Sequence, residues 1–562
     1  MPKRTGTGTI EARRKLCGPR RCRGEEKGAF RVKLTFYGAA RAVTGSCHCL
    51  EVGGRRILID CGLQQGQDEE DNRQLDFSPG DIDCVLVTHA HIDHSGRLPL
   101  LSKLGYQGPI VTTRLTARLL SIMLRDSAHI QESDAQWENR KGKRAGREPV
   151  EPVYTLADAE AALALVQTRE YGEEFELLEG VRCRFVDAGH LLGSACIELW
   201  LTEGGVERKI VFSGDLGNVD QPIIRDPQFI AEADYVVTES TYGDREHEPP
   251  ESYTGALAQI IDETLGKGGN VIIPAFAVGR TQEILYFIRE MKEQGMVKSV
   301  PDFQVVVDSP LAGEATKIFS GDLHGYLDEE ALEVVKDGDA LFTFPGLRLT
   351  ESSEESKALN MDKTPKVIIS ASGMCDAGRI RHHLKHNLWR SECAVVFVGY
   401  PAEGSLGRRL LDGVDAVKLF GETIAVRARI VNFKGLSSHA DRSHLIGWLE
   451  HFSPKPRETF VVHGDAEVTE TYATTLRDRG LSAHAPNPGE VYDLAAGIVL
   501  SPGQAPAPRQ KSQGSQGSPA FRRLEETGRM LLELIARSRG RANKDLAKLS
   551  DQLRAVMEKW DK

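Results

Sequence analysis

The sequence lacks the roughly 20 consecutive apolar residues that a membrane-spanning helix requires. Its first 33 residues also lack an apolar segment of the kind that marks a secretory signal. We therefore expect a cytoplasmic protein with no part in the membrane.

Cysteine is scarce, with ten residues in a chain of 562, which excludes a disulfide framework as the basis of the fold. Most of the cysteines lie in strand-like runs, where a free thiol behaves as a small apolar side chain. Cys17 and Cys22, together with residues 47–49 (CHC), suggest a zinc knuckle, but their spacing fits no common finger. We interpret them as tail and strand residues.

Positive charge is scarce in the body of the chain. Residues 1–33 carry a net +8 and residues 501–562 a net +6, so the total of −10 leaves −24 for residues 34–500. An acidic body argues against broad nonspecific binding to nucleic acid, and the basic tails argue mildly for it. A solvated, disordered arm explains each tail equally well.

The length predicts two or three domains. From Phe30 to about Leu500, short apolar runs alternate with helical patterns, which indicates α/β layering. The predicted strands include residues 56–60, 83–88, 183–187, 209–213, 235–238, 271–273, 304–307, 366–370, 394–398 and 459–462.

The C-terminal region differs in composition. Residues 501–519 form a Pro/Gly/Ser/Gln-rich linker. Two apolar helical stripes follow, separated by residues 538–540, and predict a helical hairpin that docks on the body or on another subunit. The stripes consist of Leu524, Leu531 and Ile535, and of Leu546, Leu549, Leu553, Val556, Met557 and Trp560.

The most specific pattern is residues 88–96 (THAHIDHSG), directly after the apolar run 84–87. In α/β proteins, sites are built in the loops at such strand ends. His89, His91, Asp93 and His94 are four ligands within six residues and can face two neighbouring metals. Imidazoles and carboxylates without thiolates favour zinc in an open, hydrolytic site. A loop that is His-rich by chance explains this pattern poorly, because it leaves many polar groups without a role.

Further candidate ligands follow three other predicted strands. His190 follows residues 183–187, Asp215 follows 209–213, and His463 follows 459–462. Any one of these alone is more often a turn residue or a core histidine. Agreement among four strand ends predicts one shared metal site.

The order HAHIDH, GH, SGD and a late HG resembles the metallo-β-lactamase superfamily. The resemblance implies an αββα sandwich, in which Asp60 matches a buried supporting aspartate that is not a ligand. It also implies two Zn²⁺ ions: His89, His91 and His190 hold one, Asp93, His94 and His463 hold the other, and Asp215 bridges them.

About 250 residues separate Asp215 from His463, and this insertion resembles the α/β β-CASP domain of nucleic-acid-processing members. The matching motifs are TESTYG at 238–243, SSHAD at 437–441 (usually Ser-Ala-His, so Ser438 departs), VHG at 462–464, PAFAVGRTQE at 274–283 and SASGM at 370–374. The resemblance runs from about Val32 to Leu494. It is strongest to bacterial and archaeal homologues of the nuclease subunit of the mRNA 3′-end cleavage factor, with RNase J more distant.

We therefore predict six segments: a disordered basic tail (1–29), the metallo-β-lactamase domain in two parts (30–243 and 431–500), the β-CASP domain (244–430), the linker (501–519) and the helical hairpin (520–562).

The resemblance implies hydrolysis of RNA. Members of this branch that act on RNA tend to have His at the position of His463, whereas DNA-repair members have Val. Inactive scaffold relatives lose several ligands, and all seven are present here. A zinc-bridging hydroxide would attack phosphorus and leave 5′-phosphate and 3′-hydroxyl ends, with Asp93 and Asp215 counted as catalytic residues through the zinc ions that they bind. His439 is suited to protonate the departing oxygen, and a hydrogen bond that it donates to Glu239 would fix its tautomer and raise its pKa.

The turn at residues 370–373 follows an apolar run and can present backbone N–H groups and hydroxyls to a phosphate, although many such turns are plain loops. The candidate phosphate contacts are Ser370, Ser372, Gly373, Arg280 and Arg379. We interpret His382, His383 and His386 as surface or RNA-contacting residues rather than metal ligands.

The leading hypothesis is a zinc-dependent endoribonuclease that acts on single-stranded RNA, with 5′→3′ exonuclease activity as a second mode. The alternatives are a DNA nuclease, a small-molecule hydrolase of thioesters or lactams, and an RNA-binding scaffold. The C-terminal hairpin predicts a homo-oligomer.

Overall fold

The structure is a computed structural model and describes residues 32–66, 72–144, 146–247, 253–336, 339–399, 401–402, 404–433, 437–505, 527–528, 531, 534–535 and 543–560. The basic N-terminal tail, most of the predicted linker and most of the first helix of the predicted hairpin lie outside these residues.

The first sheet has eight strands in the order β23-β22-β1-β2-β3-β4-β5-β6. β1 shows the alternating burial of a strand that is covered on one face. The bounds are β1 Lys33–Gly38, β2 Cys47–Val52, β3 Arg55–Ile59, β4 Cys84–Leu86, β5 Ile110–Thr113, β6 Val166–Arg169, β22 Glu490–Asp493 and β23 Ile498–Pro502, with the 3-10 turn η2 at Pro79–Asp81.

The second sheet has seven strands in the order β21-β20-β11-β10-β9-β8-β7. Two segments far apart in the chain meet in it, because β20 pairs in parallel with β11. The bounds are β7 Glu174–Leu178, β8 Val181–Asp187, β9 Ala195–Glu203, β10 Val206–Phe212, β11 Tyr235–Thr238, β20 Glu458–Val461 and β21 Ala483–His484.

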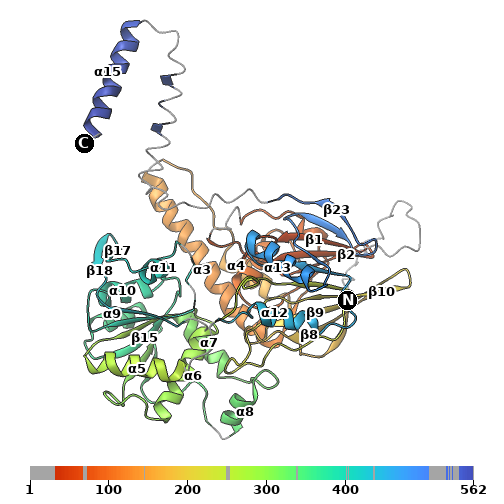
Figure 1. The fold of residues 1–562 in the computed structure, drawn as a ribbon, viewed down its shortest axis with the longest axis horizontal. Helices are drawn as coiled ribbons and strands as arrows, with labels where there is room; N and C mark the ends of the chain where they lie inside the picture. The colour runs from red at the N-terminus through yellow and green to blue at the C-terminus, as the bar shows by residue number, and fades with distance from the viewer. Residues whose placement is uncertain are drawn as a thin grey trace, which may run out of the picture. The chain divides into compact units, whose positions relative to one another are not determined.

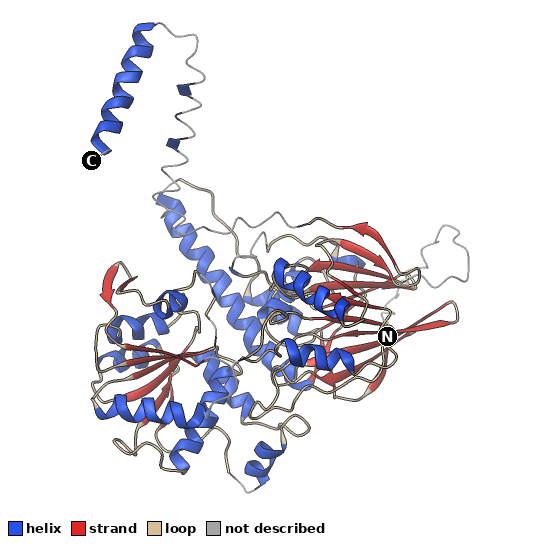
Figure 2. Cartoon of the chain, viewed as in Figure 1, coloured by secondary structure: helices blue, strands red, loops and turns tan. Residues whose placement is uncertain are grey.

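The two sheets pack face to face, and helices cover their outer faces (Figures 1 and 2). One apolar core lies between the sheets and includes Leu34, Phe185 and Phe460. The outer face of the second sheet packs under α12 Arg442–Glu450 and α13 Ala466–Asp478. The helices of the other side are α1 Ile92–Ser95, α2 Leu98–Lys103, α3 Arg114–Arg144 and α4 Leu156–Leu163. This is the predicted αββα sandwich.

Between β11 and β20 the chain builds a separate six-stranded sheet in the order β14-β13-β15-β12-β16-β19, with every pairing parallel. Its central strands read as near-continuous apolar runs because helices cover both faces (Figure 2). The strands are β12 Val271–Pro274, β13 Gln304–Val307, β14 Leu347–Leu349, β15 Lys366–Ser370, β16 Ala394–Val398 and β19 Arg429–Phe433, with a hairpin of β17 Ala416–Leu419 and β18 Glu422–Ala425. The helices are α5 Tyr253–Gly266, α6 Arg280–Glu293, α7 Pro310–Phe319, α8 Glu329–Lys336, α9 Ser353–Met361, α10 Ile380–Asn387 and α11 Leu406–Leu411.

An interdomain latch, formed by Arg114, Glu170 and Arg225 against residues 322–327, ties the inserted domain to the sandwich. Arg114 binds both Glu170 (Nε to Oε1, 2.8 Å) and the carbonyl of His324 (Nη2 to O, 3.2 Å). Arg225 donates to the buried Asp187 (Nε to Oδ2, 3.2 Å) and to the carbonyl of Gly325. The α3 and α7 helices pack together on the same side.

Residues from 507 onward form a second compact unit. Its longest described element is the helix α15 Asn543–Trp560. β23 continues to Pro502, two residues into the segment predicted as linker.

Candidate metal centre

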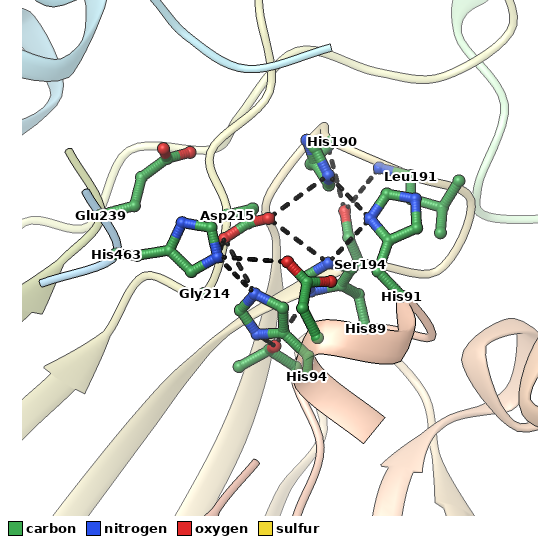
Figure 3. Close-up of polar contacts among 12 residues, drawn as sticks. His89, His91, His94, His190, Leu191, Ser194, Gly214, Asp215, Glu239 and His463 are labelled. Carbon is green, nitrogen blue, oxygen red and sulfur yellow. Dashed lines mark hydrogen bonds and ion pairs between the residues drawn. The ribbon is translucent and has the colours of Figure 1, made fainter. Parts of the chain in front are cut away.

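Four strand ends from the two sheets of the sandwich supply the candidate ligands (Figure 3). The 88–96 loop follows β4 and runs into α1, and His190, Asp215 and His463 follow β8, β10 and β20. Gly62 allows the 88–96 loop to pack closely, since a Cβ there would lie 1.6 Å from the carbonyl oxygen of Asp93. The structure therefore brings together the seven residues that were predicted as ligands.

The first ligand group consists of His89, His91, His190 and Asp215. The His91 Nδ1 atom lies 3.1 Å from His89 Nε2 and 3.2 Å from His190 Nε2. Asp215 Oδ2 lies 3.5 Å from His89 Nε2 and 3.6 Å from His190 Nε2. Three imidazole nitrogens and one carboxylate oxygen thus surround a common point.

The second ligand group consists of Asp93, His94 and His463. His463 Nε2 lies 3.0 Å from His94 Nε2 and 3.5 Å from Asp93 Oδ2. The other oxygen of Asp215, Oδ1, lies 3.2 Å from His94 Nε2 and 3.6 Å from His463 Nε2. Asp215 therefore directs one oxygen to each group, which is the geometry of a bridging ligand.

Hydrogen bonds on the far side of the rings orient the histidines. His94 Nδ1 lies 2.7 Å from the buried Asp60 carboxylate, and His190 Nδ1 lies 3.1 Å from the carbonyl of Ser438. A carboxylate and a carbonyl can only accept, so both Nδ1 atoms carry the proton and both Nε2 lone pairs face the centre. The Thr241 hydroxyl lies 3.1 Å from His463 Nδ1 and supports that ring in the same way.

The protonation states of the first ligand group suit a cation, whereas in the second group burial opposes protonation of His94 and His463 but Asp215 raises the pKa of both. Burial lowers the pKa of His89 and of His190 well below the usual value, which keeps both rings neutral. Burial opposes ionisation of Asp215, but the charges of His463 and His94 hold the pKa of its carboxyl well below the usual range.

The donor arrangement fits a divalent metal better than a hydrogen-bonded cluster. The lone pairs of His94 and His190 point at neighbouring ring nitrogens 3.0 and 3.2 Å away, and each of these contacts requires a proton on the neighbouring nitrogen or a cation between the rings. Asp215 Oδ1 is buried and has no hydrogen-bond donor among the described residues.

Glu239 and His439 lie directly beside this centre. His439 Nδ1 is 3.1 Å from Glu239 Oε1 and 4.0 Å from Asp215 Oδ2. The fully buried Glu239 is fixed by the backbone N–H of Leu216 at 2.7 Å and of Thr241 at 3.2 Å. Burial opposes the charged imidazolium, but the Glu239 carboxylate outweighs it and raises the pKa of His439 to about 9. This pair therefore places a protonated imidazole next to the ligand groups.

The predicted phosphate contacts lie at the carboxyl-end edge of the β-CASP sheet, but several are already engaged. Arg280 is buried and ion-paired with Glu283. Arg379 donates to Asp308 (Nη1 to Oδ1, 2.8 Å) and to the carbonyl of Glu351. The Ser370 hydroxyl is buried and donates to the Asp308 carbonyl at 2.8 Å. Ser372 and Gly373 are half-buried.

The surface interpretation of the histidine trio on α10 is wrong for His383. This ring is fully buried and its Nε2 lies 2.5 Å from Asp308 Oδ2, because position 383 faces the β-CASP sheet. His382 and His386 are exposed, and His382 stacks on Phe420 with ring centroids 4.2 Å apart.

Two residues near the site were missed from the sequence. Asp308 organises Arg379, His383, Thr350 and Ser356, and its position directly after β13 is the same strand-end signal that marked Asp215. Phe276 is 54% exposed and lies against Gly373. Nothing in a local pattern distinguishes an exposed phenylalanine from a buried one.

Three sequence families match this chain. Residues 40–275 match the metallo-beta-lactamase superfamily, residues 281–410 the Beta-Casp domain, and residues 423–486 the Zn-dependent metallo-hydrolase RNA specificity domain. Within the described residues, no helix has the length and apolar character needed to cross a bilayer.

The chain is 38% identical over 450 residues to "Ribonuclease TTHA0252" of Thermus thermophilus, covering 80% of this chain and 97% of that protein. It is 30% identical over 464 residues to "Transcription termination factor FttA" of Methanocaldococcus jannaschii, covering 80% of this chain and 70% of that protein. An FttA of Methanosarcina mazei is 29% identical over 459 residues, covering 79% of this chain and 69% of that protein. The chain belongs to the β-CASP branch of the metallo-β-lactamase superfamily.

Proposed function

We propose that this protein is a zinc-dependent ribonuclease that cleaves single-stranded RNA internally, with 5′→3′ exonucleolytic cleavage as a second mode. The observation that carries the proposal is the pair of ligand groups that share Asp215, with the Glu239–His439 pair beside them. RNA as the substrate is supported by the match to an RNA specificity domain and by the similarity to a ribonuclease.

The seven ligands proposed for the two ions are His89, His91, Asp93, His94, His190, Asp215 and His463. Two bound divalent ions supply an activated water nucleophile and neutralise charge on the phosphate. Asp93 and Asp215 contribute the carboxylates, and the hydrogen bonds that His94 and His190 donate to Asp60 and to the Ser438 carbonyl keep the imidazole lone pairs directed inward.

His439 acts as the general acid in this proposal. Its proton passes to the 3′ oxygen as the P–O bond breaks, leaving a 3′-hydroxyl on one product and a 5′-phosphate on the other. Glu239 orients the ring through Nδ1, which directs Nε2 toward the substrate. Among the candidate phosphate contacts, Ser372, Gly373 and Arg379 retain partial access to solvent. Ser370 and Arg280 are buried against Asp308 and Glu283, and would act on the phosphate indirectly, through these partners.

The domain boundaries given above remain part of this proposal: 30–243 with 431–500, 244–430 and 520–562. The sheets support an inserted domain, since all strands from β12 to β19 lie outside the two sheets of the sandwich.

The test uses end-labelled single-stranded RNA and DNA of the same sequence, with native protein and Asp215→Ala. RNA cleavage that a chelator stops and zinc restores, with 5′-phosphate ends, is the expected result. Equal cleavage of the DNA would favour a DNA nuclease. Hydrolysis of a thioester or lactam without cleavage of either nucleic acid would favour a small-molecule hydrolase. Binding of RNA with no hydrolysis would favour a scaffold.

A further inference from the structure

The far end of α3 carries a concentration of positive charge that the proposed chemistry does not use. Residues 137–147 (WENRKGKRAGR) contain five cations and one carboxylate, in a body that is otherwise acidic. The cations are Arg140, Lys141, Lys143, Arg144 and Arg147, and all five side chains are exposed. Within the part of the chain that the structure describes, none of the five has an acidic partner.

An exposed aromatic ring lies among these charges. Trp137 is 52% exposed, and Lys141 Nζ lies 3.3 Å from the centroid of its ring. A large apolar ring in water is costly, whereas an aromatic face beside cations is the arrangement that binds single-stranded nucleic acid, by stacking on bases and contacting phosphates.

The basic end is a folded structure rather than a frayed helix terminus. Asn139 exchanges two hydrogen bonds with the backbone of Val150, at 2.9 and 2.6 Å. The Arg147 N–H donates to the carbonyl of Gly142 at 3.0 Å, which holds Arg147 beside the last turn of the helix. Cations in a last helical turn also offset the helix dipole, but this does not explain an exposed tryptophan or an arginine beyond the helix end.

The same helix begins against the loop that contains His190. The hydroxyls of Thr113 and Thr116 donate to the carbonyl of Gly193 at 2.6 and 2.7 Å, and Gly193 belongs to the loop that contains His190. With 31 residues, α3 spans about 46 Å. After Ala128 its one buried residue is Ala135, and Figure 1 shows its far end standing clear of both sheets.

We propose that the end of α3, residues 137–144, together with Arg147 forms a second binding surface for single-stranded RNA, which holds the substrate at a distance from the metal centre. This inference rests on the proposed ribonuclease function. It predicts that RNA long enough to reach both sites binds more tightly than RNA that occupies the metal centre alone.

The experiment compares an RNA of about six nucleotides with one of about thirty, a length chosen to exceed the span of α3. Dissociation constants are measured for metal-free native protein, for R140A/K141A/K143A/R144A and for W137A, together with cleavage of the short RNA by the metal-loaded forms. The matched control is K298A/K357A/K363A/K418A, which removes four exposed lysines of the β-CASP domain.

The expected result is that the quadruple α3 variant loses about tenfold or more in affinity for the long RNA. The slope of the logarithm of the binding constant against the logarithm of the salt concentration becomes shallower by about three. W137A loses about fivefold. The control variant keeps the native affinity, and all variants cleave the short RNA at the native rate.

Native affinity of both α3 variants for the long RNA, or an equal loss in the control, overturns the inference and leaves the proposed function intact. Failure of the native protein to cleave the short RNA overturns the proposed function and the inference together.

Discussion

Asp215 is the residue on which both ligand groups depend, because its two carboxylate oxygens face different histidines. Its backbone position is equally constrained. A Cβ at Gly214 would lie 2.8 Å from Thr88 Cβ, so the loop after β10 packs directly on the start of the 88–96 loop.

Removal of this side chain should disrupt both metal sites. We expect about two zinc ions per chain in the native protein and one or fewer in Asp215→Ala. Elemental analysis measures both, with Asp302→Ala as a control for an exposed aspartate away from the centre. A native content near one that added zinc does not raise contradicts the dinuclear proposal.

His439 is close to the candidate ligands without belonging to either of the two ligand groups. If it protonates the leaving 3′ oxygen, His439→Ala should slow cleavage about 10²–10⁴-fold while the zinc content stays native. An RNA with sulfur in place of that oxygen has a leaving group that needs little protonation. The variant should therefore recover much of its lost rate on the sulfur substrate.

The matched control for this prediction is His89→Ala, whose defect lies in the metal centre and is not repaired by sulfur. Equal and unrescued defects in both variants would show that His439 is a ligand or positions the substrate, and that it does not donate the proton.

At the scale of secondary structure, the latch joins β8 and the segment after α7 across the domain boundary. Asp187 ends β8 and accepts the Gly189 N–H at 3.0 Å, so the residue that holds Arg225 also shapes the turn before His190. The latch and the metal centre thus share one loop.

Arg225→Ala should lower the free energy of unfolding by about 1–3 kcal/mol, because it leaves a buried carboxylate without its cation. Burial raises the pKa of Asp187 to about 6, even with Arg225 present. A carboxyl with a raised folded pKa contributes most stability at low pH, and this contribution is lost as the pH rises through about 6.

The loss in free energy of unfolding caused by Arg225→Ala should therefore be larger near pH 8 than near pH 5. Scanning calorimetry of the metal-free protein at both values tests this, with Arg457→Ala, which removes an exposed ion pair, as the control. A deficit that is the same at both pH values would show that Asp187 does not titrate against Arg225.

The whole molecule consists of two compact units, and the second begins near residue 507. Because β23 extends to Pro502 and pairs with β22, a truncation that leaves the sheet intact must follow it. We expect truncation after Gln504 to lower the oligomeric state without changing the zinc content, since the apolar stripe predicted for 543–560 needs a partner. Light scattering gives the mass, and an unchanged mass would assign the C-terminal unit another role.

The sequence by itself determined the layering, the inserted domain and the positions of the candidate ligands. The layering and the candidate ligands follow from local rules, whereas the inserted domain was predicted from its resemblance to the β-CASP domain. An apolar run of strand length predicts a strand, and a polar residue just after it lies at the strand end, where loops from neighbouring strands meet. His190 and Asp215 were found in this way, although nothing near them in the chain indicates a metal.

Only the tertiary structure decided which atoms meet and which charges are already satisfied. It directs the two oxygens of Asp215 to different groups, buries His383 against Asp308, and neutralises Arg280 with Glu283. It also leaves Trp137 exposed at the end of a long helix. Burial and pairing depend on segments hundreds of residues away in the chain, such as β11 and β20, and a local pattern does not contain that information.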